Sequence, residues 1–447
     1  MSNCQEVIAV VTFVSVIFLL ITEWLHFMIV AFLGALVLII SKVMTMPEAI
    51  SYIGKSYGTL GLFFGVMVMV RAFQPTRVFE YLATKMVIWA NGRGDRLLLS
   101  LMGLVTIMSA VLPNATTVML LAPLIPPIAQ EIGVDFIPLL ILITFVANSG
   151  GLLTLVGDPV TYIVGDALNI SFVDYLTQIS WGGVAAVGTI GFCLPVLFRR
   201  IWRKKLTNLD RLAQPEINHP RALVFGTVIT VFVLVFFVIG DSLPIPISPV
   251  TVALLGAALA LLLSHHSRID SVQYILRDVD WSTLIFFMGF FVLIGGLEKT
   301  GVILKLSEVL AIALGQDIGL TSLILLFAIG LLSSVVPNIP LVVAMVPLLK
   351  QLAVNAGWSG IEILAPGFQG QLPAAVLPMF YAMILGATLG GNGTLVGASA
   401  NLVAAGVAEQ YGKRISFKTF LRYGIPMMAI QLGVAALYLS FRFLIWV

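Results

Sequence analysis

Two apolar stretches of this chain are each interrupted by a proline–asparagine turn. Pro113-Asn114 lies in the first half and Pro337-Asn338 lies at the matching place in the second half. A glycine-rich polar segment follows each turn, at 150–159 and at 390–399. In a membrane protein, such breaks are tolerated only where the backbone is buried in protein or lines a cavity. Matched breaks in two halves are the best sequence indication of a transporter's binding site.

We expect the side chains at these breaks to surround one binding pocket. Each Asn follows a proline and is predicted to cap the next helix, so that free N–H groups and the positive end of the helix dipole face the pocket. In the glycine-rich segments, Asp158 is predicted as an N-cap with Pro159 at the first helical position, and Ser399 as the matching cap. The candidate substrate-binding residues are Asn114, Thr116, Thr117, Asn148, Thr154, Asn338, Asn392, Thr394, Ser399 and Asn401.

Asp158 is the most informative single residue. It is the only charged side chain between Asp135 and Asp166, and Ala398 occupies the matched position of the second half. A carboxylate inside a membrane span is costly and is a functional candidate by default. We interpret it as a proton or cation site; the alternative is that it only caps a helix. The candidate coupling residues are Asp158, Gly157, Thr161 and Gly397, and Na⁺ could bind near Asn114, Gly157, Asn338 and Gly397.

Composition indicates a membrane protein. Of 447 residues 60% are hydrophobic and 10% are charged, against roughly 25% charged in soluble domains. The first apolar run lacks the basic start and cleavage site of a signal peptide, so we expect it to stay in the membrane. The net charge of +3 offers no argument for nucleic-acid binding, and two cysteines are too few for a disulfide framework. No catalytic residue, cofactor or dedicated metal site is expected.

The two halves align as an internal repeat, 1–198 and 222–447, joined by a basic linker at 199–221. Segments 97–131 and 319–355 contain the Pro-Asn turns and are predicted as re-entrant hairpins that enter and leave on one side. Each half then has five spans, an odd number, so the repeats are inverted. The expected spans are 7–22, 25–42, 57–73, 137–166 (broken), 179–198, 222–240, 247–264, 281–297, 374–409 (broken) and 423–444, with interfacial arm helices at 76–92 and 301–316.

Basic residues agree with this arrangement. With the hairpins as re-entrant segments, most of the 24 Lys and Arg residues fall on one side, which the positive-inside rule makes cytoplasmic. Both termini then lie outside. If the hairpins crossed the membrane, Arg71, Arg77, Arg93 and Arg96 would move to the outer side and the bias would weaken. The expected fold is an all-α protein of the cell membrane with discontinuous helices.

The breaks resemble a known group of proteins. Segments 155–159 (Leu-Val-Gly-Asp-Pro) and 391–401 (Gly-Asn-Gly-Thr-Leu-Val-Gly-Ala-Ser-Ala-Asn) are similar to the ion transporter superfamily. The similarity is greatest to its arsenite permease and pink-eyed dilution (P) protein branch, alongside NhaD-type sodium/proton antiporters. It implies a scaffold domain (7–73 and 222–297) that often dimerises, and a transport domain of hairpins and broken spans that moves as a unit. It also implies that Asn114, Thr116, Asn338, Gly157 and Thr394 surround the substrate.

These observations favour a secondary active transporter that exports a small inorganic solute by alternating access, coupled to H⁺ or Na⁺. The solute would be a neutral hydroxide, such as arsenite or silicic acid, or a monovalent cation. A dicarboxylate or other anion uptake carrier on the same fold and a passive ion channel are the alternatives. An enzyme is disfavoured because no second membrane aspartate and no His-Glu-x-x-His motif is present. The expected partners are the solute, the coupling ion, the bilayer and a second copy of the chain.

Overall fold

The computed structural model describes residues 3–22, 24–206, 218–365, 368 and 370–444, and an all-helical chain is confirmed over these residues. One isolated bridge, between Arg93 and Lys205, is the exception to helix and loop. Residues 207–217 of the predicted linker lie outside the described part. The helices of the first half are α1 (Asn3–Thr22), α2 (Phe27–Ile40), α3 (Met46–Lys55), α4 (Tyr57–Phe73), α5 (Val78–Trp89), α6 (Gly94–Ser109), α7 (Asn114–Leu121), α8 (Ile125–Glu131), α9 (Phe136–Gly150), α10 (Pro159–Leu168), α11 (Phe172–Gln178), α12 (Ser180–Leu197) and α13 (Arg199–Trp202).

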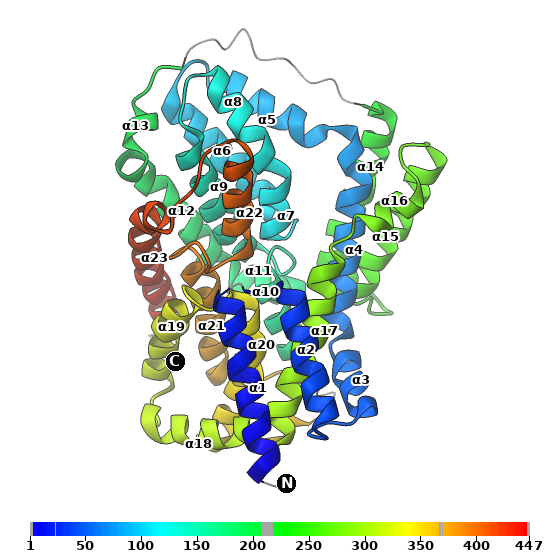
Figure 1. Ribbon diagram of the computed structural model, residues 1–447, viewed down its shortest axis with the longest axis vertical. Helices are drawn as coiled ribbons and strands as arrows, with labels where there is room; N and C mark the ends of the chain where they lie inside the picture. The colour runs from blue at the N-terminus through cyan, green and yellow to red at the C-terminus, as the bar shows by residue number, and fades with distance from the viewer. Residues whose placement is uncertain (1–2, 23, 207–217, 366–367, 369, 445–447) are drawn as a thin grey trace.

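The second half also contains long, short and broken helices. Its arm helix α18 and the first-half arm α5 lie across opposite ends of the molecule (Figure 1). Between those ends the long helices run roughly parallel to the long axis (Figure 1). The helices of this half are α14 (Pro220–Ile239), α15 (Pro249–His266), α16 (Val272–Arg277), α17 (Trp281–Lys299), α18 (Val302–Leu314), α19 (Ile318–Ser333), α20 (Asn338–Asn355), α21 (Leu377–Gly390), α22 (Ser399–Gln410) and α23 (Phe417–Leu439).

Many helices are long enough to span a bilayer. Within the described ranges nine are long and apolar enough, or ten if α18 and α19, which meet at a bend of 115°, form one span. Helix α2 and the segment Ala374–Gly390 are shorter apolar helices, whereas α20, predicted as part of a hairpin, has the length of a span. Length alone therefore does not separate spans from hairpins, and the predicted division into five spans and one hairpin per half stays a prediction.

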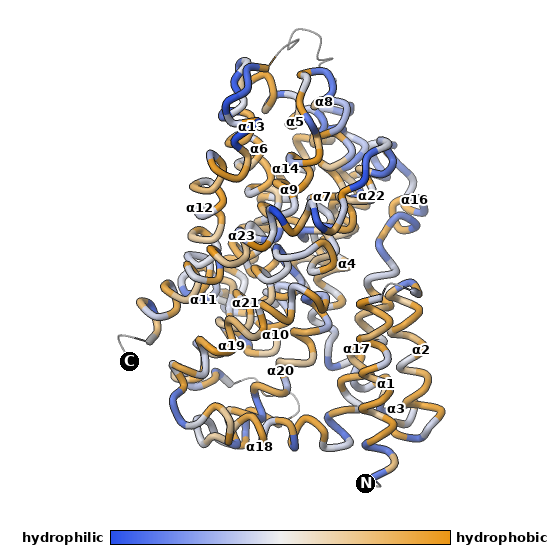
Figure 2. The backbone as a smooth tube through the Cα atoms, turned by 60° about the vertical axis from the view of Figure 1, so that its left-hand side comes forward, coloured by the Kyte–Doolittle hydropathy of each residue, from blue (hydrophilic) through white to orange (hydrophobic). Residues whose placement is uncertain are grey.

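Burial ranks the helices from centre to periphery. The window Phe136–Leu153, which contains α9, is 83% buried, whereas α1 is 17% and α14 is 22% buried. Figure 2 shows hydrophobic residues along most helices and hydrophilic residues concentrated near the upper turns. Helix α9 is thus a central helix that carries Asn148 and Ser149 among protein neighbours, while α1 and α14 present apolar faces outward.

A capping box begins α3, and its glutamate also forms an ion pair with α17. The hydroxyl of Thr45 accepts from the Glu48 N–H, and the Glu48 carboxylate accepts from the Thr45 N–H at 2.7 Å and from Lys299 Nζ at 2.6 Å. Lys299, and then the Thr45 groups, lower the pKa of Glu48 to about 2. Because this folded-state pKa is below the ordinary value of 4.5, the stabilisation is present above pH 4.5 and is lost as the pH falls towards 2.

Replacing Glu48 with glutamine is expected to lower thermal stability slightly at pH 7, and the difference from the native protein should shrink as the pH falls towards 2. The reason is that protonation removes the same charge that the substitution removes. Thermal unfolding in detergent at several pH values measures this. Glu362, in the short turn Ile361–Leu364, offers the control substitution Glu362→Gln. A stability difference for Glu48→Gln that stays constant with pH would contradict the assignment.

Candidate substrate and coupling site

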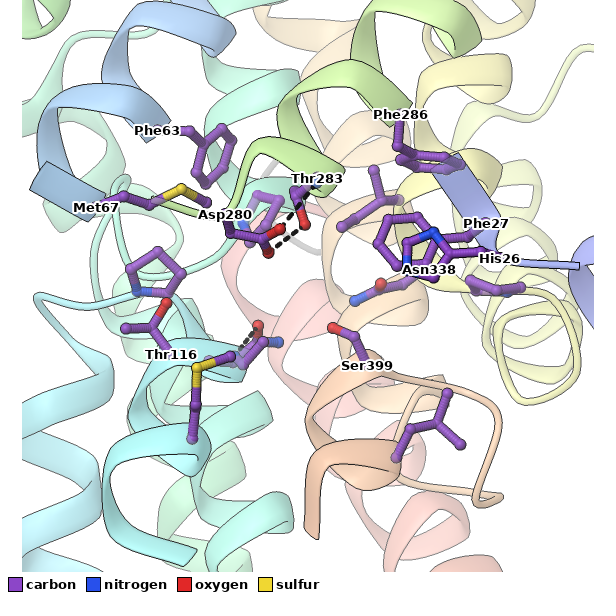
Figure 3. A pocket seen from close by; sticks show the side chains of 18 of the residues that line it. His26, Phe27, Phe63, Met67, Thr116, Asp280, Thr283, Phe286, Asn338 and Ser399 are labelled. Atoms are coloured by element: carbon purple, nitrogen blue, oxygen red, sulfur yellow. Dashed lines mark hydrogen bonds between the residues drawn. The ribbon is translucent and has the colours of Figure 1, made fainter. Parts of the chain in front are cut away.

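Four helices begin at one cavity. Asn114 is the first residue of α7, Pro159 of α10, Asn338 of α20 and Ser399 of α22, and all four line a cavity of about 520 Å³. The two hairpin turns therefore meet the two broken segments in one place. Figure 3 shows Thr116, Asn338 and Ser399 around this space. The first-turn N–H groups of an α-helix lack intrahelical partners and carry the positive end of its dipole, so these four ends contribute positive potential to their side of the cavity.

The opposite wall was not anticipated from the sequence. It comes from the α1–α2 turn, the beginning of α17 and the middle of α4, with His26, Asp280 and Phe63 among its side chains (Figure 3). Asp280 is engaged in capping α17, because it accepts from the Thr283 N–H at 3.0 Å and from the Thr283 hydroxyl at 2.6 Å. Single residues on otherwise apolar helices gave no local signal that this wall would face the hairpins.

The arginine at the cavity margin is paired with carboxylates. Arg71 contacts Asp278 at 2.7 Å and Asp270 at 3.2 Å. Arg71, followed by Arg277, holds the pKa of Asp278 below its usual range. An arginine that bridges two carboxylates adds little net positive charge to the cavity. The helix ends, rather than a free cationic side chain, therefore supply the positive potential beside the hairpin turns.

Asp158 is completely buried at the start of α10, next to the cavity residue Pro159. Its predicted role as an N-cap is confirmed, because one carboxylate oxygen accepts from the Val160 N–H at 2.8 Å. The other oxygen accepts from Asn114 Nδ2, also at 2.8 Å. Ala398 has nearly the same backbone conformation, with φ −146° and ψ 144° against −143° and 141° at Asp158. The two positions match in backbone but only one carries a charge.

Buried amides continue from Asp158 into the second half. Asn114 Nδ2 donates to Asn148 Oδ1 at 3.1 Å, and Asn148 Nδ2 donates to Asn392 Oδ1 at 3.0 Å and to Asn401 Oδ1 at 3.3 Å. Each of these side chains is at most 4% exposed. Five of the predicted site residues are thus brought together in one hydrogen-bonded chain, which we call the amide chain.

Two further residues, Gln431 and Ser149, extend the amide chain and were not predicted from the sequence. Gln431 Oε1 accepts from Asn392 Nδ2 at 2.8 Å, while Gln431 Nε2 donates to Ser149 Oγ at 2.8 Å and to the Ala186 carbonyl at 3.1 Å. Gln431 is the only amide side chain of α23. An isolated amide in an apolar helix was an available signal, because a buried amide needs partners. Ser149 was overlooked beside Asn148.

The predicted caps Asn114, Asn338 and Ser399 are wrong by one position. The N-cap positions are Pro113, Pro337 and Ala398, and none of them makes a side-chain capping bond. Both prolines adopt φ −52° with extended ψ, so the fixed proline φ makes the turn. The following residue is already helical. The side chains of Asn114, Asn338 and Ser399 face the cavity from this first helical position.

Several predicted residues join the hairpins to the broken segments and do not line the cavity. The Thr154 hydroxyl donates to the Ala110 carbonyl at 2.5 Å, and the Thr394 hydroxyl donates to the Ser334 carbonyl, at matched places in the two halves. The Thr161 hydroxyl donates to the carbonyl of Leu155 at 2.8 Å. Four of the ten substrate-binding candidates line the cavity, namely Asn114, Thr116, Asn338 and Ser399. The others do not line it: Thr117, Asn148, Asn392, Thr394 and Asn401 are buried, and Thr154 is half-buried.

Gly157 and Gly397 lie at close backbone approaches. A Cβ added at Gly157 would lie 2.5 Å from the Ser109 carbonyl oxygen, and one at Gly397 would lie 3.1 Å from the Ser333 carbonyl oxygen. Both glycines thus allow the end of a hairpin helix to contact a broken segment. Close packing, as well as chain breaking, accounts for the glycine in these segments.

Comparison with known proteins agrees with this architecture. A model of the citrate transporter family CitMHS matches residues 17–366. An uncharacterized transporter of Synechocystis sp. is 62% identical over 98% of both chains, and one of Mycobacterium bovis is 32% identical over 99% of both. The P protein of Homo sapiens is 27% identical over 97% of this chain and 60% of that protein. The YdaH transporter of Alcanivorax borkumensis superposes with a TM-score of 0.56 at 12% identity, covering 88% of this chain and 87% of that one.

The fold and the matches together define a multi-pass membrane protein that is a secondary transporter and not an enzyme. The chain belongs to the CitMHS citrate transporter family of the ion transporter superfamily. The resemblance to the P protein branch is confirmed by the P protein matches, and YdaH has the same overall fold.

Proposed function

We propose that this protein transports a small oxygen-rich anion by alternating access and couples that transport to protons. The observation that carries the proposal is the meeting of four helix N-termini, at Asn114, Pro159, Asn338 and Ser399, on one cavity. Such ends favour anions, because their N–H groups and dipoles point at the ligand. Of the solutes considered from the sequence, a monovalent cation is the least supported. Carboxylates fit the donors best, and neutral hydroxides such as arsenite or silicic acid are the second candidate.

We assign the coupling ion as H⁺ and its site as Asp158. The two oxygens of this carboxylate already face N–H donors, each at 2.8 Å. A Na⁺ ion needs oxygen ligands and would be repelled by these donors, whereas a proton needs only one of the oxygens. Sodium coupling near Gly157, Gly397 and the hairpin turns is the alternative, and Na⁺ dependence of transport distinguishes it.

Two inverted repeats of five spans and one hairpin fit this function. Support comes from the opposite placement of α5 and α18 (Figure 1) and from the matched bonds of Thr154 and Thr394 to Ala110 and Ser334. These bonds would let each hairpin move together with its broken segment. We further propose that the protein lies in the cell membrane as a homodimer with both termini outside.

Reconstituted proteoliposomes test the proposed function. An imposed pH gradient should drive accumulation of a labelled carboxylate such as citrate or succinate, and unlabelled carboxylates should compete better than arsenite, silicic acid or Na⁺. Accumulation against the solute gradient excludes a passive channel. Transport of arsenite or silicic acid without competition by carboxylates would show that the solute is a neutral hydroxide and not an anion. Transport driven only by Na⁺ would overturn the assignment of H⁺ as the coupling ion.

Asn338→Ala is expected to lower transport at least tenfold and to leave the melting temperature unchanged. A tenfold loss corresponds to about 1.4 kcal/mol of lost solute binding. Asn338 lines the cavity, and no hydrogen bond from its side chain to the described residues is present. Asn114→Ala should impair both properties, because it leaves one oxygen of Asp158 and the Oδ1 of Asn148 without their donor, at a cost of about 1–3 kcal/mol. Transport assays with parallel thermal unfolding measure both. Equal loss of stability in the two variants would indicate that Asn338 is structural.

A further inference from the structure

The orientation of Asn401 is determined by the backbone. Its Nδ2 donates to the carbonyls of Gly391 at 2.8 Å and Thr394 at 2.9 Å. Carbonyl oxygens only accept, so a reversed amide would place three acceptors together. Asn401 Oδ1 must therefore point to Asn148 as an acceptor, and Asn148 must donate.

The hydrogen bonds of Gln431 independently require Asn148 to be a donor. Its Nε2 donates to the Ala186 carbonyl at 3.1 Å, which leaves Oε1 to accept from Asn392 Nδ2 at 2.8 Å. Asn392 Oδ1 is then the acceptor for Asn148 Nδ2 at 3.0 Å. Two independent sets of backbone carbonyls thus require Asn148 to donate towards the second half of the chain.

The direction continues to the carboxylate. Because Asn148 donates through its nitrogen, its Oδ1 accepts from Asn114 Nδ2 at 3.1 Å. The Ala115 N–H donates to Asn114 Oδ1 at 2.7 Å and orients Asn114 in the same sense. Asn114 Nδ2 therefore has to offer its second hydrogen to Asp158. Among the described residues, both Asp158 oxygens contact donors only.

We infer that the amide chain is a directional hydrogen-bond relay that holds Asp158 as a proton acceptor, and that Gln431 and Asn401 are its positioning residues rather than solute ligands. An N–H directed at a carboxylate favours the charged form. The Asn114 N–H therefore opposes proton uptake by Asp158, and Asn114 also lines the cavity. The inference rests on the proposed function only in taking Asp158 as the coupling group.

Other titratable groups near α10 are accounted for. Tyr175 interacts electrostatically with Asp158, but its hydroxyl donates to the Leu152 carbonyl at 3.1 Å. Asp166 lies eight residues further along α10, at roughly 12 Å by helix rise, and Lys350 donates to the neighbouring Ala167 carbonyl at 2.6 Å. The remaining titratable side chains on α10 and on the helices packed against it are Tyr162 of α10, Tyr57 and Arg71 of α4 and Tyr381 of α21.

Infrared titration of the full-length protein in lipid nanodiscs tests the relay without any solute. The carbonyl stretch of a protonated carboxyl, assigned by its loss in Asp158→Asn, reports the proton on Asp158. In Asn148→Leu the pH at which this band is half-developed should rise by about one unit, a tenfold gain in proton affinity. Gln431→Met, which preserves side-chain length, should raise it by less, because Asn401 still orients Asn148.

Thr388→Val is the matched control. Thr388 occupies the second-half position that corresponds to Asn148, and its buried hydroxyl has no hydrogen-bond partner in the described structure. This variant should titrate like the native protein. An unshifted band in Asn148→Leu and Gln431→Met, or an equal shift in Thr388→Val, would overturn the relay. If Asn148→Leu does not fold, Gln431→Met alone decides. Shifted bands without proton-driven transport would instead refute the proposed function and leave the relay intact.

Discussion

Asp158→Asn is expected to abolish proton-driven accumulation of the solute and to remove the pH dependence of the remaining exchange. The variant keeps a side chain that can cap α10, since asparagine is a good N-cap, but it cannot bind and release a proton. It should lose about 1–3 kcal/mol of stability, because an amide nitrogen would face a donor at one of the two carboxylate positions. Uptake in proteoliposomes with and without a pH gradient measures the loss.

Asp166→Asn is the control on the same helix. Asp166 lies at the other end of α10, where its carboxylate approaches Gly58 at the start of α4. It should retain proton-driven uptake and its pH dependence. If Asp158→Asn still accumulates solute in response to a pH gradient, Asp158 is a helix cap and the coupling site lies elsewhere.

Gly390→Ala is expected to be strongly destabilising. A Cβ at this position in α21 would lie 2.2 Å from the Gly330 carbonyl oxygen of α19, and backbone cannot move aside as a flexible side chain does. Overpacking a core usually costs about 1–3 kcal/mol and occasionally more; we expect about 3 kcal/mol or more here. Gly386, one turn earlier, makes a similar approach to the Leu326 carbonyl at 2.7 Å. The pair forms a small-residue helix contact of the kind common in membranes.

The matched control is Gly406→Ala in α22, where nothing lies within 4 Å of the added Cβ. This change should leave stability unchanged or raise it by up to about 1 kcal/mol, because alanine favours a helix interior over glycine. Thermal unfolding in detergent compares the two variants. A Gly390→Ala protein that melts with the native one would show that α19 and α21 separate easily at this crossing.

Local breaks were predictable from the sequence, whereas long-range partners were not. Proline, asparagine and glycine act on the backbone where they stand, so the turns at Pro113 and Pro337 and the cap at Asp158 could be identified directly. The one-residue error at Asn114 and Asn338 arose because a proline turn resembles a side-chain cap in sequence. At Ser399 the cap position is Ala398, which has no polar side chain to mark it.

The partners of the buried polar groups depend on packing between distant helices. Gln431 contacts Ser149 only because α23 crosses the end of α9, and no spacing along the chain encodes that crossing. The wall containing His26 and Asp280 is likewise formed by elements that are far apart in the sequence. For Thr154 and Thr394, the residue type indicated polarity correctly, but the hydroxyls bond to nearby carbonyls instead of the cavity.

The alanine at position 398 has a consequence for charge movement. With Asp158 as the only carboxylate of the matched pair, a cycle that uses it carries one proton per chain. Co-transport with a singly charged anion is then electroneutral, whereas a solute of higher charge carries current. For a solute of higher charge, the transport rate therefore responds to membrane voltage, because moving one elementary charge through 100 mV changes the free energy by about 2.3 kcal/mol.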